Sequence, residues 1–318
     1  MKIKKTLRRI LRMIKRLPRK IRIALRYLKN NGITCTADQI YLNLFDKSSP
    51  AKGLKYGVTR KKERRQPQLI VSLTSFPGRI NVVDQGIVSL LSQTLKPDML
   101  ILWLAESQFP NRDNDLPKAL LRLKKYGLQI RYCEDIRSYK KLIPALRLYP
   151  NDIIATADDD NIYDKKWLEL LYKSYLNQPQ NVQCHRVTKF IYDKNTDSFS
   201  IVKGGLDFYK EASFLNKLVG LGGVLYPPGI FYKDILDSEL FMKLAPTNDD
   251  IWFWFMAALN NAKVNVVPSN ISRANYIKGT QEGPCLTKIN DAGENLFWEQ
   301  FNNLLSYYPQ LKARLTED

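Results

Sequence analysis

The chain has 318 residues, 44% of them hydrophobic, which is enough for one large domain or two small ones and excludes an intrinsically disordered protein. Its formal net charge is +19, but the charge is uneven. Residues 1–30 carry 13 Lys and Arg and no acid, residues 31–65 carry 8 against 3, and residues 66–318 carry 29 against 28. The basicity belongs to one end of the chain, so we expect no nucleic acid partner for the main body.

Cysteine usage and hydropathy indicate the cellular compartment in which the protein is expected. The four cysteines lie far apart without a C-x-x-C pair, which argues against a zinc site and against a disulfide framework: Cys35, Cys133, Cys184 and Cys285. The sequence has no run of about 18 apolar residues and no apolar core of a secretory signal near its start. We therefore expect reduced thiols in a cytoplasmic protein without a membrane-spanning helix.

Residues 1–30 predict a basic amphipathic helix. Its apolar residues recur every three or four positions, with Lys and Arg between them: Ile3, Leu7, Ile10, Leu11, Ile14, Leu17, Ile21, Leu25 and Leu28. Such a helix lies in the plane of an anionic membrane surface, which predicts a peripheral protein on the cytoplasmic face of the cell membrane. The alternatives are a coiled coil, which would need acidic residues to pair with the bases, and an RNA-binding arm, for which the apolar stripe has no use. Residues 31–66 are predicted to be a linker with a second basic cluster.

From residue 67 the pattern alternates between strands and helices. The expected order is strand 69–73, helix 82–91, strand 99–104, strand 128–133, a helix opened by Lys140 and Lys141, and strand 153–157. This spacing predicts an α/β fold with a parallel, Rossmann-like nucleotide-binding sheet. Lys140 and Lys141 are candidates for meeting a diphosphate, although lysines at a helix start are more often solvated charges.

Three consecutive carboxylates, Asp158, Asp159 and Asp160, follow the strand 153–157 directly. The carboxyl edge of an open α/β sheet is where ligands bind, and adjacent acids repel one another unless a cation or proton neutralises them. Mg²⁺ and Mn²⁺ prefer such oxygen ligands and are commonly held by one or two carboxylates plus substrate phosphates. The alternative is a solvated turn or a helix cap, but Asp164 stands nearer the next expected helix, 167–176.

The second half of the sequence predicts shorter strands and contains two further groups of candidate site residues. Strands are expected at 181–187, 190–192 and 199–202, the last two joined by a turn. Gly222 and Gly223 allow a close approach of the backbone to another group. Asp249 and Asp250 precede an aromatic helix at 251–259, where helix capping would account for one acid. Its Trp252 and Trp254 are expected in the core, as is the single histidine, His185.

Together these motifs resemble the GT-A class of nucleotide-sugar-dependent glycosyltransferases, specifically the bacterial family 2-like enzymes of capsule, lipopolysaccharide and cell-wall polysaccharide synthesis. The resemblance covers residues 67–260. It rests on the first strand and its loop, the segment 92–97, Asp158-Asp159-Asp160 as the D-x-D signature, Gly222-Gly223, and Asn248-Asp249-Asp250 where the family carries a Glu-Asp pair.

The resemblance implies a GT-A domain at 67–270, with a mixed sheet in its acceptor half, and a C-terminal helical extension at 271–318. It implies that Asp158 and Asp160 bind Mn²⁺ or Mg²⁺ and that Asp249 or Asp250 is the catalytic base. Residues expected to bind the nucleotide sugar are Thr74, Ser75, Arg79, Lys140, Asp158, Asp159, Gly222 and Gly223.

The expected reaction is transfer of a sugar, with inversion, from a nucleotide diphosphate sugar to a hydroxyl of a glycan or lipid-linked acceptor. One alternative is a nucleotidyltransferase, but the loop at 74–79 has a single glycine where several would be needed. A phosphatase of the D-x-D-x-Thr type would need Thr or Val at Ile162. A non-catalytic membrane-associated protein that binds sugar or RNA would leave both acidic clusters without a role.

Overall fold

The computed structural model describes residues 54–202, 211–268, 274–282, 290 and 296–317. The predicted basic helix, residues 1–30, lies outside the described residues, as does the first part of the predicted linker. The chain divides into the units Met1–Gly53 and Leu54–Asp318, and the fold below is that of the second unit. This unit includes residues 54–66, because Gly57 N–H donates to the Tyr126 carbonyl and Thr59 N–H to the Pro97 carbonyl. The folded unit therefore begins before the boundary predicted at residue 67.

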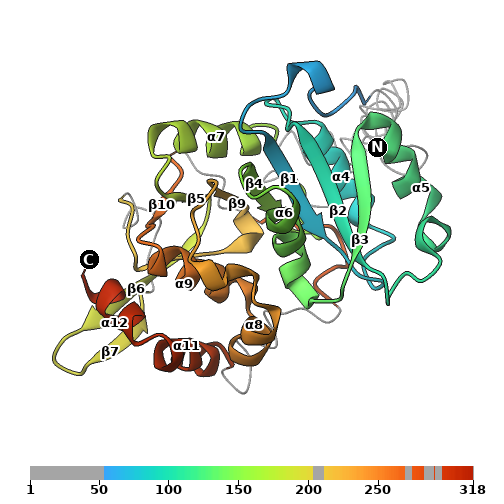
Figure 1. Ribbon diagram of the computed structural model, residues 1–318. Helices are drawn as coiled ribbons and strands as arrows, with labels where there is room; N and C mark the ends of the chain where they lie inside the picture. The colour runs from blue at the N-terminus through green and yellow to red at the C-terminus, as the bar shows by residue number, and fades with distance from the viewer. Residues whose placement is uncertain (1–53, 203–210, 269–273, 283–289, 291–295, 318) are drawn as a thin grey trace, which may run out of the picture. The chain divides into compact units, whose positions relative to one another are not determined.

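A seven-stranded sheet with the order β10-β5-β9-β4-β1-β2-β3 forms the centre of the unit (Figure 1). Its strands are β1 (Leu69–Thr74), β2 (Met99–Ala105), β3 (Leu128–Cys133), β4 (Ile153–Ala157), β5 (Val182–Cys184), β9 (Val224–Tyr226) and β10 (Val264–Val266). All neighbours pair in parallel except β9, which runs antiparallel to both β4 and β5. The predicted α/β fold class, a Rossmann-like sheet with a mixed half, is confirmed.

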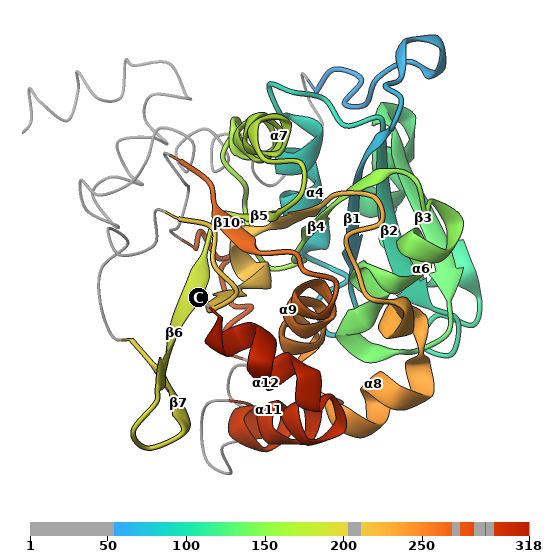
Figure 2. The same cartoon turned by 60° about the vertical axis from the view of Figure 1, so that its left-hand side comes forward.

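Helices cover both faces of this sheet, which explains why its strands are apolar runs and not alternating patterns. The helices α4 (Val83–Leu91) and α7 (Trp167–Asn177) lie on one face, and α6 (Ile143–Leu148) and α9 (Asp249–Leu259) lie on the other (Figure 2). Ile70 of β1, Ile143 of α6 and Trp252 of α9 are all fully buried in one hydrophobic cluster. The expected core positions of Trp252 and Trp254 are thus confirmed.

A second, three-stranded sheet and the C-terminal helices complete the unit. The sheet has the order β7-β6-β8 and consists of β6 (Val187–Asp193), β7 (Ser198–Ile201) and β8 (Asn216–Leu218). The other α-helices among the described residues are α5 (Lys118–Leu121), α8 (Ser238–Leu244), α11 (Leu296–Tyr307) and α12 (Pro309–Thr316). Short 3-10 helices are η1 (Lys61–Glu63), η2 (Arg112–Asp115), η3 (Arg122–Tyr126), η4 (Arg137–Lys141), η6 (Gly220–Gly222) and η7 (Lys233–Leu236). Because α11 and α12 pack on α9, the predicted C-terminal extension shares the main core.

The order of the strands positions the functional site. The chain builds β1, β2 and β3 outward in one direction and then returns through α6 to β4, on the other side of β1. Loops that leave β1 and β4 therefore diverge and open a crevice at their carboxyl ends, where ligands bind in open α/β sheets. Within the described residues, we find no helix with the length and apolar character needed to cross a membrane.

Candidate active site

A cavity of about 850 Å³ opens at the carboxyl ends of the parallel strands. Most of the predicted site residues line it: Thr74, Ser75, Arg79, Lys140, Asp158, Asp159, Asp160, Asp249 and Asp250. Gly222 and Gly223 are not among its lining residues. Residues separated widely in the sequence thus face one another across one space, as the strand order requires.

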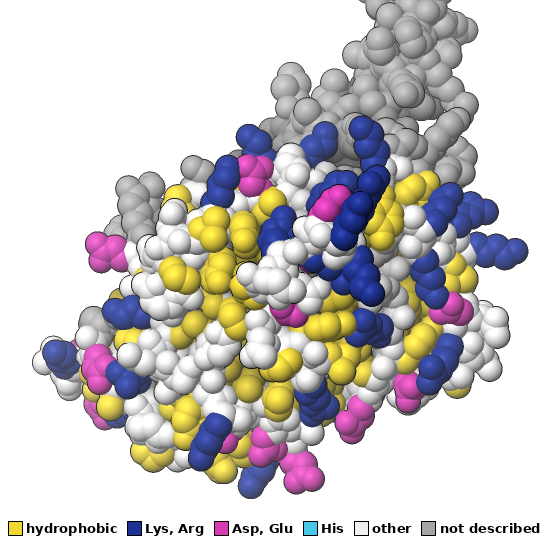
Figure 3. Space-filling model, turned by 45° about the horizontal axis from the view of Figure 1, so that its top comes forward, with side chains coloured by type: hydrophobic (Ala, Val, Ile, Leu, Met, Phe, Trp, Pro, Cys, Tyr) yellow, Lys and Arg dark blue, Asp and Glu magenta, His cyan; other side chains and the backbone are white. Residues whose placement is uncertain are grey.

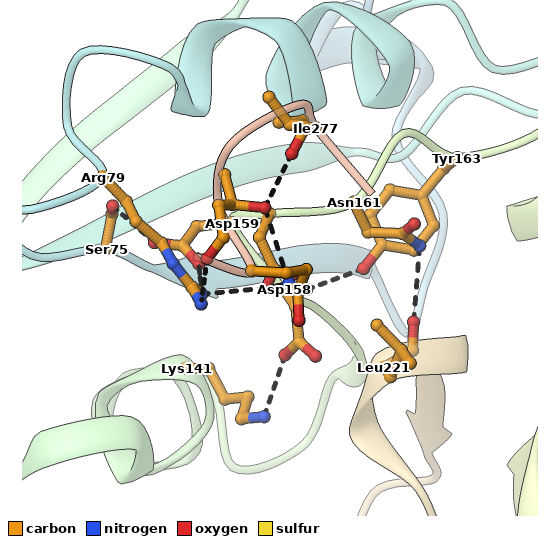
Figure 4. A network of polar contacts seen from close by, with 12 residues as sticks. Ser75, Arg79, Lys141, Asp158, Asp159, Asn161, Tyr163, Leu221 and Ile277 are labelled. Carbon is orange, nitrogen blue, oxygen red and sulfur yellow. Dashed lines mark hydrogen bonds and ion pairs between the residues drawn. The ribbon is translucent and has the colours of Figure 1, made fainter. Parts of the chain in front are cut away.

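The side chain of Asp159 is fixed by the loop after β1 (Figure 4). The parallel register pairs Leu73 with Ala157, so Ser75 and Asp159 leave the sheet side by side. Ser75 Oγ donates to Asp159 Oδ2 at 2.7 Å, and Arg79 Nη1 donates to Asp159 Oδ1 at 2.8 Å. Both carboxylate oxygens of Asp159 are therefore engaged by protein donors, which suits a residue that holds the loop in place.

Asp160 is only partly satisfied by the protein. Its Oδ2 lies 3.0 Å from Arg79 Nη1 and accepts a hydrogen bond from Gln281 at 2.9 Å, whereas its Oδ1 is buried without a hydrogen-bond partner. Burial, followed by the nearby charge of Asp158, raises the pKa of Asp160 to about 6. A buried, unsatisfied carboxylate oxygen of this kind favours the approach of a cation.

Lys141 connects the two acidic clusters of the cavity. Its Nζ lies 3.0 Å from Asp158 Oδ1 and 3.1 Å from Asp249 Oδ2. Although burial lowers the pKa of Lys141, the charges of Asp158 and Asp249 outweigh burial and raise it, so the ammonium group stays protonated. The neighbouring Lys140, which we predicted as a nucleotide-sugar ligand, lines the same cavity and forms an ion pair with Asp135.

The acids at the start of α9 are not used as helix caps. Asn248 is the N-cap residue, and its side chain accepts a hydrogen bond from Ile251 N–H at 3.2 Å. The expectation that capping accounts for one of the two acids is therefore wrong, because the adjacent amide takes that position. Asp250 Oδ2 accepts from Gly220 N–H at 2.9 Å. Burial raises the pKa of Asp250, an effect that Lys141 opposes and Asp249 reinforces.

The donors at the end of β4 fit a divalent cation that a substrate would help to bind. Among the described residues, no three His, Cys, Asp or Glu side chains are placed to hold a metal ion together. The unsatisfied Oδ1 of Asp160 and the adjacent Asp158 nevertheless supply the one or two carboxylates that Mg²⁺ and Mn²⁺ take when a diphosphate completes their coordination.

The predicted glycine pair has a structural role in this protein. Gly223 has φ of +87°, and a Cβ atom there would lie 2.3 Å from the indole nitrogen of Trp167. A Cβ atom on Gly222 would lie 2.9 Å from Cβ of Arg186. The close approach expected at these glycines is therefore made to α7 and the loop before β6. Placing them among the residues that face the nucleotide sugar is not supported.

Two further expectations concern single residues near α7. His185 is fully buried, its Nε2 lies 3.0 Å from the Trp167 carbonyl, and burial lowers its pKa to about 4, which confirms a satisfied core histidine. Asp164 is not the helix N-cap, because α7 begins after Lys166, whose N–H donates to Asp164 Oδ1 at 2.9 Å. The Asp158–Asp160 turn remains free of a capping role.

The structure adds cavity residues that sequence reasoning missed. Gln108 and Asp135 follow β2 and β3, and Gln108 Nε2 donates to Asp135 Oδ2 at 2.8 Å. Gln108 Oε1 is buried without a partner, so it can accept a hydrogen bond from a ligand. Gln281 reaches Asp160 from a segment held by the 2.7 Å bond from Ile277 N–H to the Asp160 carbonyl. Gln108 and Asp135 could have been predicted as site residues, because each lies shortly after a strand. Gln281 belongs to no recognisable motif, so the sequence gives no signal for it.

Comparisons with known proteins leave the activity open. No family model matches the chain, and no curated protein matches its sequence. Among solved structures, the chain is similar to the crystal structure of GalNAc-T7 with UDP, GalNAc and Mn²⁺, with a TM-score of 0.44 and 10% sequence identity. The match covers 77% of this chain and 50% of that chain, so this chain spans about half the length of that structure. A similarity of this size assigns no activity or site residue to the chain.

Proposed function

We propose that this protein is a metal-dependent glycosyltransferase that moves a sugar from a nucleotide diphosphate sugar to a hydroxyl of a glycan acceptor, with inversion. The observation that carries this proposal is the placement of two acidic clusters in one cavity, on the two sides of Lys141. One cluster offers carboxylates for a divalent cation, and the other offers a carboxylate for proton removal. Direct displacement at an anomeric carbon needs both.

The donor would occupy the half of the cavity built by β1 to β4. Asp158 and Asp160 would hold Mn²⁺ or Mg²⁺, which neutralises the charge of a departing nucleoside diphosphate when bound. Arg79, Lys141 and the hydroxyl of Ser75 fix the carboxylates in this half through the contacts described above. Gln108 and Asp135 are our candidates for binding the nucleoside, since they line the cavity beyond β2 and β3.

Asp250 is the proposed base. Asp249 directs Oδ2 to Lys141, whereas Asp250 is held by a backbone N–H and keeps a carboxylate oxygen available. A raised pKa also suits a base that works near neutral pH, because proton transfer is then better matched to the operating conditions. Asp249 would orient the ammonium group of Lys141 and influence the pKa of Asp250.

We also propose that the protein acts at the cytoplasmic face of a membrane, where a lipid-linked acceptor would be presented. The sequence of residues 1–30 motivates this proposal. The folded unit adds support through the run Arg60-Lys61-Lys62-Glu63-Arg64-Arg65, and Lys and Arg side chains gather at one end of the face in Figure 3. Polybasic surfaces of this kind bind anionic lipids.

A donor screen tests the enzymatic proposal. Nucleotide diphosphate sugars are incubated with the full-length protein and a mixture of glycan acceptors, with Mn²⁺ or with EDTA, and release of the nucleoside diphosphate is measured. The proposal expects Mn²⁺-dependent release from at least one donor and its loss in Asp250→Asn. Full activity in EDTA would exclude the metal, and release of sugar 1-phosphate in place of the nucleoside diphosphate would indicate transfer of the nucleotidyl group instead.

A further inference from the structure

One wall of the cavity is a face of the small β7-β6-β8 sheet. Antiparallel pairing places Thr188 opposite Lys217 and Phe190 opposite Ile201. Arg186 directly precedes β6, and Thr188 lies within that strand. Arg186, Thr188, Lys217 and Ile201 all line the cavity, which confirms that this face is turned inward.

Two cations on this wall lack a carboxylate partner. Arg79, Lys140 and Lys141 each form an ion pair with an aspartate of the same cavity. In contrast, Arg186 and Lys217 form no ion pair within the described part of the chain. The Lys217 residue is only 9% exposed, so its ammonium group has lost much of its water. Cations in such a position favour an anionic ligand.

Aromatic side chains of α11 border the same wall. Phe297 and Trp298 line the cavity with ring centroids 5.3 Å apart, and Nζ of Lys217 lies 5.7 Å from the Phe297 centroid. Trp298 is only partly buried, which leaves ring surface for a ligand. Lys217 and Asp250 line the same cavity. A ligand on this wall would therefore lie near the proposed base.

We infer that this wall binds an acceptor saccharide that carries an anionic group, a carboxylate or a phosphate, on Arg186 and Lys217, with a sugar ring against Trp298. The inference rests on the proposed function, because it assigns the acceptor side of the same site. A carboxylate would come from an acidic sugar, and a phosphate from a phosphate-linked carrier or a phosphorylated sugar. The shared feature is a negative charge beside the attacking hydroxyl.

The test compares charged and neutral probes on the full-length protein by isothermal titration calorimetry. The acceptor probes are methyl glucuronide, glucose 6-phosphate and the neutral methyl glucoside; the donor probes are UDP, GDP, CDP and dTDP with Mn²⁺. The variants are Arg186→Met and Lys217→Met. Lys233→Met is the matched control, because Lys233 also lies over an aromatic ring, 5.8 Å from the Tyr232 centroid, but does not line the cavity.

We expect at least one acidic probe to bind about tenfold more tightly than the neutral probe, the size of one charged hydrogen bond. Arg186→Met and Lys217→Met should each remove that advantage and leave nucleotide binding unchanged, and Lys233→Met should change neither. Equal binding of acidic and neutral probes overturns the inference. Weaker nucleotide binding in both variants also overturns it, because the cations would then serve the donor diphosphate. Failure of every nucleotide to bind the wild-type protein contradicts the proposed function instead.

Discussion

Nζ of Lys141 lies 3.1 Å from Oδ2 of Asp249, and this ion pair joins the segment before α6 to the start of α9. The same ammonium group lies 3.0 Å from Asp158, which follows β4. One buried cation therefore brings together the two acidic clusters that the sequence separates. Without it, carboxylates from two parts of the chain would face one another across the cavity.

Removal of Lys141 should destabilise the protein. Lys141→Met leaves the buried carboxylate of Asp249 and the partly buried carboxylate of Asp158 without their shared partner, and breaking a buried ion pair from one side costs about 3–5 kcal/mol. Urea denaturation followed by circular dichroism measures the free energy of unfolding. Lys140→Met is the neighbouring control and should cost less, because its partner Asp135 is 32% exposed at the side chain. Equal losses in the two variants would contradict the bridging role.

Asp250→Asn should lower turnover by roughly 10²–10⁴, the usual effect of losing a positioned general base, with donor affinity nearly unchanged. The reason is that Asp250 keeps an oxygen for the acceptor hydroxyl, whereas Asp249 is paired with Lys141. Steady-state kinetics on the donor found in the screen checks this prediction. Asp249→Asn is the matched variant one residue away; if it is inactive and Asp250→Asn is active, the assignment of the base is wrong.

His185 should make stability depend on acid pH. Its pKa falls from 6.5 to about 4 on burial, so the unfolded chain binds a proton in this interval that the folded protein does not. Stability is therefore lost as the pH falls from 6.5 to 4, by about 3 kcal/mol in total. Urea titrations across this interval should show the loss in the wild type. His185→Gln should flatten that part of the profile, and an unchanged slope would exclude His185 as its cause.

Deletion of residues 1–30 should abolish sedimentation with anionic liposomes and largely preserve transfer to a soluble acceptor. Thirteen cations lie in this segment, and each is worth about 1 kcal/mol near an anionic surface, less at high salt. Neutral liposomes provide the control for the electrostatic part of binding. Undiminished pelleting of the truncated protein in moderate salt would place the anchor elsewhere, and the run at 60–65 would be the next segment to test.

The parallel half of the fold follows from local patterns. The run Ile153–Ala157 is apolar, short and flanked by turn residues, and this pattern predicts a buried strand. The predicted bounds agree with those of β4. The same reasoning gives β3 its correct bounds and places Asp158 at the carboxyl end of a strand. Because parallel strands end at one edge, most of the donor half of the site could be predicted from the chain order alone.

Long-range packing decides which contacts the site residues make, and the sequence alone does not show these contacts. Lys140 and Lys141 are adjacent, and only the 3-10 turn of η4 determines that Lys141 reaches Asp158 and Lys140 reaches Asp135. Glycine is required at position 223 because a Cβ atom there would clash with the indole of Trp167, and no local sequence pattern predicts this contact. The cavity wall built by the small sheet depends on the pairing of β6 with β8, which brings together residues from segments that carry no recognisable motif.

Manganese-dependent donor binding tests the central claim most directly. Isothermal titration with UDP, GDP, CDP and dTDP compares the wild type with Asp160→Asn, which removes the charge of the carboxylate whose Oδ1 is unsatisfied. The matched control is Asp197→Asn, because Asp197 pairs with Lys312 at the surface and does not line the cavity. The account predicts that one nucleotide binds the wild type and Asp197→Asn in Mn²⁺ and not in EDTA, and that Asp160→Asn loses the Mn²⁺-dependent part while its unfolding transition is retained. Equal binding with and without Mn²⁺, or full binding by Asp160→Asn, would contradict it.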